Sequence, residues 1–109
     1  MGQLRMTWTT QAVLRAFLDD LENPRYGFEL GALTGLASGT VHPILARLEA
    51  AGWVESFWEE IDTTAEGRPR RRYYRLTADG IPAARQALAE ATAGRAKLNA
   101  RLRPIGETG

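Results

Sequence analysis

The 109-residue sequence contains no cysteine and a single histidine, His42. Without thiols the chain has no disulfides and no thiolate metal sites, and one lone imidazole is too few ligands for zinc. No nucleophile–base arrangement and no glycine-rich phosphate loop is visible, so we expect no metal, no cofactor and no enzymatic activity. Runs of about 20 apolar residues and a basic-then-apolar leader pattern are also missing. We therefore expect a cytoplasmic chain without a membrane segment.

The net charge is only +1, but the charges are unevenly distributed. Residues 53–67 contain five acids and no base, namely Glu55, Glu59, Glu60, Asp62 and Glu66. Residues 68–75 contain five arginines and no acid, namely Arg68, Arg70, Arg71, Arg72 and Arg75. A nearly neutral total therefore hides a concentrated cationic segment.

The spacing of apolar residues predicts three helices in the first half of the chain. The first covers about residues 9–21, with Thr9 or Thr10 as its cap, and a short second helix covers 28–33. Its apolar set is Phe28, Leu30 and Leu33. The third helix is expected to begin at Ser38, as N-cap, and to end at Gly52, a residue suited to left-handed backbone.

Within this third helix one face is apolar and the opposite face is polar. The predicted inward residues are Val41, Ile44, Leu45 and Leu48. The residues left outward are His42, Pro43, Ala46, Arg47 and Glu49. We expect the inward face to pack on the other helices and the outward face to meet solvent or a partner.

Aromatic and β-branched residues then predict two antiparallel strands at 53–60 and 70–76, joined by a loop at 61–69. The aromatic side chains there could form a ligand-stacking platform, but filling the buried face of a hairpin is the more common role; they are Trp53, Phe57, Trp58 and Tyr73. Thr77 is expected to cap a last helix at about 78–102.

This order of elements predicts an α+β fold, mostly α: a winged helix-turn-helix with a long C-terminal helix. We expect residues 7–77 to form the winged helix-turn-helix and residues 78–103 to form a C-terminal helix for dimerisation. The remaining residues, 104–109, are expected to be a flexible tail.

Three segments resemble the PadR family of transcriptional regulators: YGFEL at 26–30, GTVHPILARLEAAG at 39–52 and GRPRRRYYRLTADG at 67–80. The single last helix is similar to the short form of that family. The resemblance implies a homodimer that binds double-stranded DNA and represses transcription. It also implies that an aromatic or drug-like small molecule is a candidate effector. His42 stands where the family usually has tyrosine, so the preferred DNA sequence and the response to pH are expected to differ.

The start of the third helix is the predicted reading surface, because a helix-turn-helix places this part in the major groove. Its predicted DNA contacts are Ser38, Gly39, Thr40, His42, Pro43 and Arg47. The wing adds Arg68, Arg70, Arg71 and Arg72 as predicted contacts to phosphate or the minor groove.

Each of these residues also has an alternative role that does not involve DNA. Ser38 and Thr40 could only cap the helix, Arg47 could pair with Glu49, and His42 could be an idle surface residue. The wing arginines could pair across the hairpin with Glu55, Glu59 and Glu60, and we allow a structural role for Arg72 or Arg75. The whole chain would then be a protein-interaction module.

The last helix is the predicted dimer device, because apolar residues recur along it about every seven positions. The predicted dimer or effector residues are Ile81, Leu88, Leu98 and Leu102, together with Trp8 ahead of the first helix. Two copies related by a two-fold axis would read a pseudo-palindrome with half-sites about 10 bp apart or a multiple of this. The alternative is that the last helix packs only on its own domain.

Overall fold

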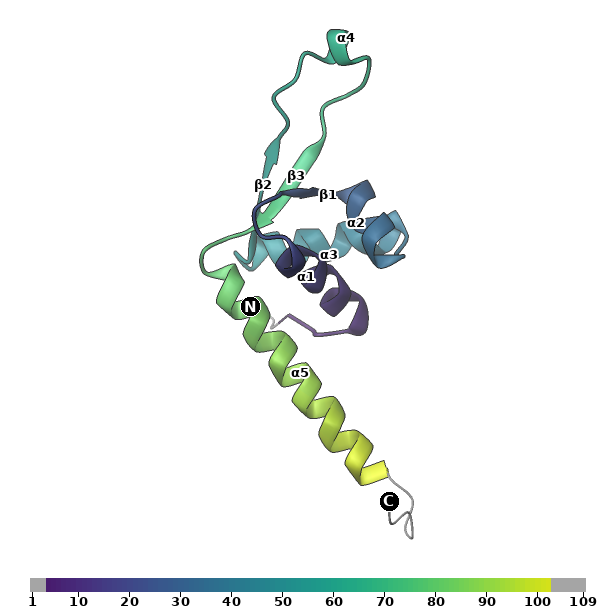
Figure 1. Cartoon of the computed structure of the whole chain (residues 1–109), viewed down its shortest axis with the longest axis vertical. Helices are drawn as coiled ribbons and strands as arrows, with labels where there is room; N and C mark the ends of the chain where they lie inside the picture. Colours follow the sequence, from purple (N-terminus) through teal and green to yellow (C-terminus); the bar gives the residue numbers. More distant parts are fainter. Residues whose placement is uncertain (1–3, 103–109) are drawn as a thin grey trace.

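In the computed structural model, residues 4–102 are described, so the tail predicted at 104–109 lies outside the described part. The elements are α1 (Trp8–Asp19), β1 (Arg25–Tyr26), α2 (Gly27–Thr34), α3 (Ser38–Ala50), β2 (Val54–Trp58), α4 (Thr63–Glu66), β3 (Arg72–Leu76) and α5 (Gly80–Leu102). Helices α1 to α3 form one cluster, the β2–β3 hairpin projects from it in one direction, and α5 extends in the opposite direction (Figure 1). The predicted winged helix-turn-helix with a long last helix is therefore confirmed.

The core lies where α1, α2 and α3 meet the base of the hairpin. The predicted inward stripe of α3 is confirmed, because Val41, Ile44, Leu45 and Leu48 are almost completely buried. Helix α1 contributes Val13, Leu14, Ala16 and Phe17 to the same core. Thr7 caps α1 by accepting the Thr10 N–H, so the predicted cap at Thr9 or Thr10 is wrong. The helix begins at Trp8, one residue earlier than expected.

Helix α2 buries a single large side chain, Leu30. Phe28 and Leu33 were expected beside it, but both are exposed, Phe28 by 81%. An eight-residue helix turns only about twice, so only a narrow strip of it can face the core. Helix α3 starts after Ala37, not after Ser38, and the chain leaves it through Gly52 at φ +79°, as the left-handed prediction requires.

Two antiparallel pairings build the small sheet, in the order β1-β3-β2. The predicted β2–β3 hairpin is confirmed, with a register from Val54↔Leu76 to Trp58↔Arg72. Strand β1 was not predicted, because two residues are too few for a period-2 pattern to show. Helix α4 was also not predicted; the Asp62 carboxylate caps it by accepting the N–H groups of Thr64 and Ala65.

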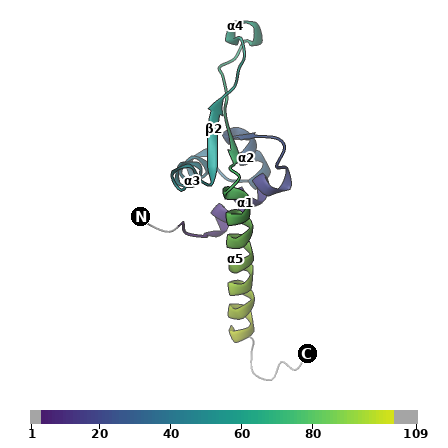
Figure 2. The same cartoon turned by 90° about the vertical axis from the view of Figure 1, so that its left-hand side faces the viewer.

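Helix α5 begins at Gly80, two residues later than expected. The predicted capping role of Thr77 is confirmed, because its hydroxyl accepts the Gly80 N–H at 2.9 Å. The first half of the helix packs on the core through Ile81, Ala84 and Leu88. Its second half, from residue 92 on, is exposed along its whole length and continues away from the helical cluster (Figure 2). None of the helices in residues 4–102 is long and apolar enough to cross a membrane.

The junction between the hairpin and α5 requires glycine at position 80. A Cβ atom there would lie 1.9 Å from the Trp53 carbonyl oxygen, so the backbones would have to move apart. We predict that Gly80→Ala lowers the free energy of unfolding by about 1–3 kcal/mol. Urea denaturation followed by circular dichroism measures the change.

The matched control is Gly94→Ala on the exposed half of α5, where a Cβ atom meets nothing within 4 Å. Alanine is the better helix former, so this change should raise stability by about 0.5–1 kcal/mol. Equal effects of the two substitutions would contradict the close contact at Gly80.

Candidate DNA interface

The outward face of α3 is exposed. Thr40 is half-buried, and the other predicted contact residues of this helix are exposed, namely Ser38, Gly39, His42, Pro43 and Arg47. The N-cap residue is Ala37, which makes no side-chain cap hydrogen bond, so the alternative in which Ser38 or Thr40 only caps the helix is wrong. The first N–H groups of α3 and the positive end of the helix dipole therefore remain available for an anion.

Arg47 does not pair with Glu49. Within residues 4–102, no acidic group lies within ion-pair distance of Arg47. Glu49 instead accepts a hydrogen bond from the Ser56 hydroxyl of β2, and its Oε2 lies 4.0 Å from Nη2 of Arg72 on β3. These contacts fasten α3 to the hairpin and leave Arg47 uncompensated on the outward face.

His42 lies against the start of α2. A Cβ atom added to Gly27 would come within 2.6 Å of the His42 Cε1 atom, so the glycine makes room for the imidazole ring. The first turn of α2 thereby adjoins the outward side of α3. The exposed Phe28 follows directly after Gly27 on this first turn.

We call residues 54–76 the wing. Successive side chains of a strand point to opposite faces, so the wing has two different faces. Arg72 donates to the Ser56 hydroxyl at 2.8 Å, and its Cζ lies 5.1 Å from the ring centroid of Trp58, so these three share the face next to α3. On the opposite face Arg75 forms an ion pair with Glu55 at 2.7 Å and lies over the Phe57 ring.

Arg71 belongs to this opposite face as well. Its Cζ lies 4.4 Å from the ring centroid of Tyr26 on β1, and that ring makes an edge contact with Tyr73 on β3. The third strand thus supplies an aromatic support for a wing arginine. This contact was not predicted, because a two-residue strand such as β1 leaves no pattern in the sequence.

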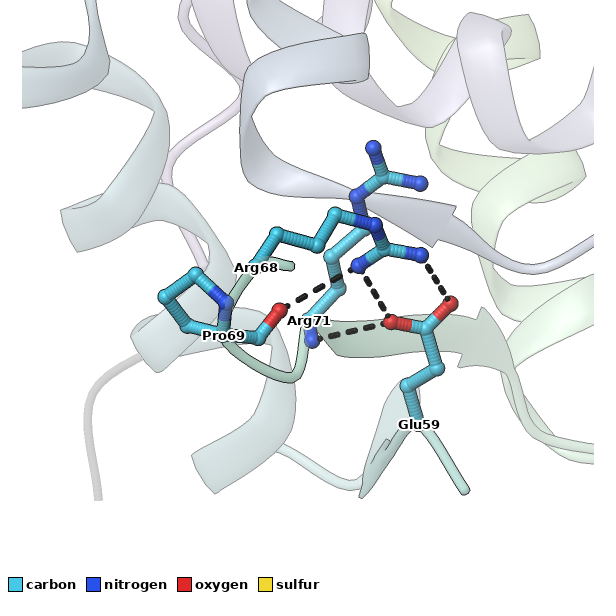
Figure 3. Close-up of polar contacts among 4 residues, drawn as sticks. All are labelled: Glu59, Arg68, Pro69 and Arg71. Carbon is cyan, nitrogen blue, oxygen red and sulfur yellow. Dashed lines mark hydrogen bonds and ion pairs between the residues drawn. The ribbon is translucent and has the colours of Figure 1, made fainter. Parts of the chain in front are cut away.

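Glu59 connects the two sides of the wing just beyond the strands. Its carboxylate accepts two hydrogen bonds from the Arg68 guanidinium, at 2.7 and 3.0 Å, and a third from the Arg71 backbone N–H at 3.2 Å (Figure 3). The bonds from Arg68 lower the pKa of Glu59 from 4.5 to about 2, and the same contact raises the pKa of Arg68 above its ordinary value.

The alternative of internal pairing therefore applies to some wing arginines and not to others. Arg68, Arg72 and Arg75 have acidic partners at 2.7, 4.0 and 2.7 Å. Arg70 and Arg71 form no ion pair with any acid in the described residues. Contact of Arg68 with DNA stays a prediction, and it would require Glu59 to share or release the guanidinium.

The model of the PadR-like family of transcriptional regulators matches residues 17–90, which include α2, α3 and the wing. The chain belongs to this family. No curated protein matches the sequence.

Solved structures of other transcriptional regulators, two of them PadR-like, have the same fold. A PadR family regulator from Clostridium difficile R20291 is 20% identical, with a TM-score of 0.70, and the match covers 89% of this chain and 100% of that one. A transcriptional regulator from Clostridium thermocellum is 24% identical, with a TM-score of 0.67 and coverages of 88% and 91%. A PadR-like regulator from Bacillus cereus is 19% identical, with a TM-score of 0.63 and coverages of 87% and 91%.

The aromatic residues expected on the buried face of the hairpin do not all lie there in this PadR-like chain. Trp53 packs on the core, and Tyr73 is half-buried against Tyr26 and Phe57. Trp58 is 56% exposed and Phe57 is 37% exposed, and neither belongs to the core, so their predicted place on a buried hairpin face is wrong. A hairpin is a single layer, so a face of it is buried only where helices cover it, and β2 ends at Trp58, beyond the helices (Figure 1).

The predicted dimer and effector residues separate into two groups. Ile81 and Leu88 pack partly on the core of their own chain, as the alternative of internal packing proposes for this half of α5. Leu98, Leu102 and Trp8 are exposed, Leu102 by 70% and Trp8 by 67%. Within the described chain, no cluster of three acidic, histidine or cysteine side chains is arranged to hold a metal ion.

The low pKa of Glu59 makes the stability of this PadR-like wing depend on pH. Because the folded pKa lies below the unfolded one, the stabilisation is complete above about pH 5 and is lost as the pH falls towards 2. We predict that Glu59→Gln lowers the melting temperature at pH 6 and has almost no effect near pH 2. Thermal denaturation across this pH range measures the difference.

Glu60→Gln is the matched control, because it removes a negative charge from the neighbouring position and Glu60 forms no ion pair within residues 4–102. A melting-temperature difference for Glu59→Gln that is the same at pH 6 and pH 2 would exclude an ionised Glu59 as the cause.

Proposed function

We propose that this PadR-family protein is a homodimeric repressor that binds a pseudo-palindromic DNA operator and acts without catalysis in the cytoplasm. The observation that supports it is the pairing pattern of the cations. Arg47 on α3 and Arg70 and Arg71 on the wing form no ion pairs in the described part of the chain, whereas neighbouring arginines do. Arginines without acidic partners are what a phosphate backbone requires, and Arg47 and Arg70 are also exposed.

Helix α3 would enter the major groove with its N-terminal half. There Thr40 and His42 face the base edges, Ser38 and the amide of Gly39 contact a phosphate, and Arg47 reaches the backbone one turn later. Pro43 would add apolar contact beside His42. The buried stripe on the other side of α3 holds this surface at a fixed orientation.

The wing would contact the phosphates or the minor groove next to the same half-site mainly through Arg70. Arg71, which lies over Tyr26 on the opposite face of the wing, would add a lesser phosphate contact. Arg72 would bridge the wing and α3, since it reaches both Ser56 and Glu49. Arg68 would chiefly hold the wing in shape through Glu59.

Two copies would associate through the exposed half of α5, so residues 7–77 would serve as the DNA-binding unit and residues 78–103 as the dimerisation helix. The two α3 helices would then read half-sites about 10 bp apart, or a multiple of this. A flat aromatic effector could bind near Trp8 and change the spacing between the two reading helices.

The DNA contacts are tested by gel shifts with an operator obtained by genome-wide DNA selection with the purified protein. We predict that Arg47→Ala and Arg70→Ala each weaken binding and each reduce the slope of log affinity against log salt by about 1 unit, because each removes one phosphate contact. Arg75→Ala is the control, since Arg75 is paired with Glu55 near the base of the wing. If the wild-type protein selects no DNA, the chain is a protein-interaction module.

The dimer is tested through the exposed leucines of α5. We predict that Leu98→Glu together with Leu102→Glu converts the dimer into a monomer, because carboxylates would be buried without partners at the interface. Analytical ultracentrifugation measures the mass. Lys97→Glu is the control: it places a carboxylate on the same exposed stretch and removes no leucine, so it should remain dimeric. A double variant that is still a dimer would contradict the assignment.

A further inference from the structure

Trp58 is a large side chain outside the core, and its contact with the Arg72 guanidinium leaves most of the ring exposed. Trp58 is 56% exposed, whereas Trp53, directly before the start of β2, packs on the core. We propose that Trp58 is a further DNA-binding residue of the wing, contacting the sugar–phosphate backbone of the minor groove beside the half-site. This inference depends on the DNA binding proposed above.

A continuous series of contacts connects Trp58 to the reading helix. Glu49 on α3 accepts from Ser56, Ser56 accepts from Arg72 at 2.8 Å, and the Arg72 guanidinium lies 5.1 Å from the centroid of the Trp58 ring. Trp58 also lies directly opposite Arg72 in the strand register. The indole therefore belongs to the face of the wing that continues from the outward side of α3, and Figure 2 shows α3 and β2 next to each other.

Trp58 and Arg70 line the same shallow hollow, of about 440 Å³, at the end of the strands. Its remaining lining residues are Glu59, Glu60, Ile61 and Asp62. Two of these carboxylates are occupied, Glu59 by Arg68 and Asp62 by the N–H groups at the start of α4. Glu60 would repel a phosphate, so DNA would approach from the side of Trp58 and Arg70 and not over the wing tip.

The indole contributes differently from an arginine. It offers a large apolar surface for deoxyribose and one N–H donor for a phosphate oxygen. It carries no charge, so its contact with DNA releases no counterion, and it should change affinity without changing the salt dependence.

The test compares Trp58→Ala with wild type on the selected operator at several salt concentrations. We expect about a tenfold loss of affinity at every salt concentration, with a slope parallel to that of wild type, whereas Arg70→Ala changes the slope. Phe57→Ala is the matched control, since Phe57 is the preceding residue of β2 and lies on the opposite face, and it should keep wild-type affinity.

A second measurement does not depend on the alanine variant. Acrylamide quenching of tryptophan fluorescence is recorded for wild type and Trp58→Phe, with and without operator DNA. DNA should protect the wild-type emission, and most of this protection should be missing in Trp58→Phe. That variant should also retain part of the affinity, because it keeps an aromatic ring but lacks the N–H donor.

The outcomes separate the inference from the function on which it depends. If wild type binds no DNA, the proposed function fails first. The role of Trp58 is overturned if wild type binds DNA, Trp58→Ala binds it equally well, and DNA does not protect the wild-type fluorescence from quenching. Equal losses for Trp58→Ala and Phe57→Ala would assign Trp58 to hairpin stability, and a change in sedimentation alone would assign it to a protein contact; both results overturn the proposal.

Discussion

The burial of one side of α3 is the constraint on which the rest of the structure depends. Four apolar residues of this helix, Val41, Ile44, Leu45 and Leu48, are almost completely removed from water, and each such burial contributes about 1.5–3 kcal/mol. Rotating α3 would expose this stripe, so its opposite face, with His42 and Arg47, has a fixed direction. The wing takes its position from the same helix, because Glu49 contacts Ser56 and Arg72.

The wing shows how a nearly neutral segment can still present cations. Three of its arginines are paired with acids: Arg68 with Glu59, Arg75 with Glu55, and Arg72 with Glu49 of α3. Pairs of this kind at a surface contribute little stability, but they fix the direction of long side chains. The arginines that remain, Arg70 and Arg71, set the local field, and one of them is supported by the Tyr26 ring.

This chain belongs to the PadR-like family and has the same fold as a solved member, and within that fold the two halves of α5 differ. The first half of α5 completes the core through Ala84, while the second half leaves Leu98 and Leu102 in solvent. A helix of 23 residues that packs over only part of its length has an apolar surface left for a partner. This is the physical basis for the proposed dimer, in which the angle between the two copies of α5 would set the distance between the two reading helices.

The sequence by itself determined the helix order, the inward stripe of α3, the hairpin and the cap of α5 by Thr77, because these follow from periodicity and local hydrogen bonding. It did not determine strand β1, the ion pair between Glu59 and Arg68, or the exposure of Phe28 and Trp58. Each of these depends on which segments meet in space: Arg25 and Tyr26 become a strand only because β3 lies beside them. Periodicity shows which side of an element is apolar, but only the packed chain decides how much of that side is covered and which charges are neutralised.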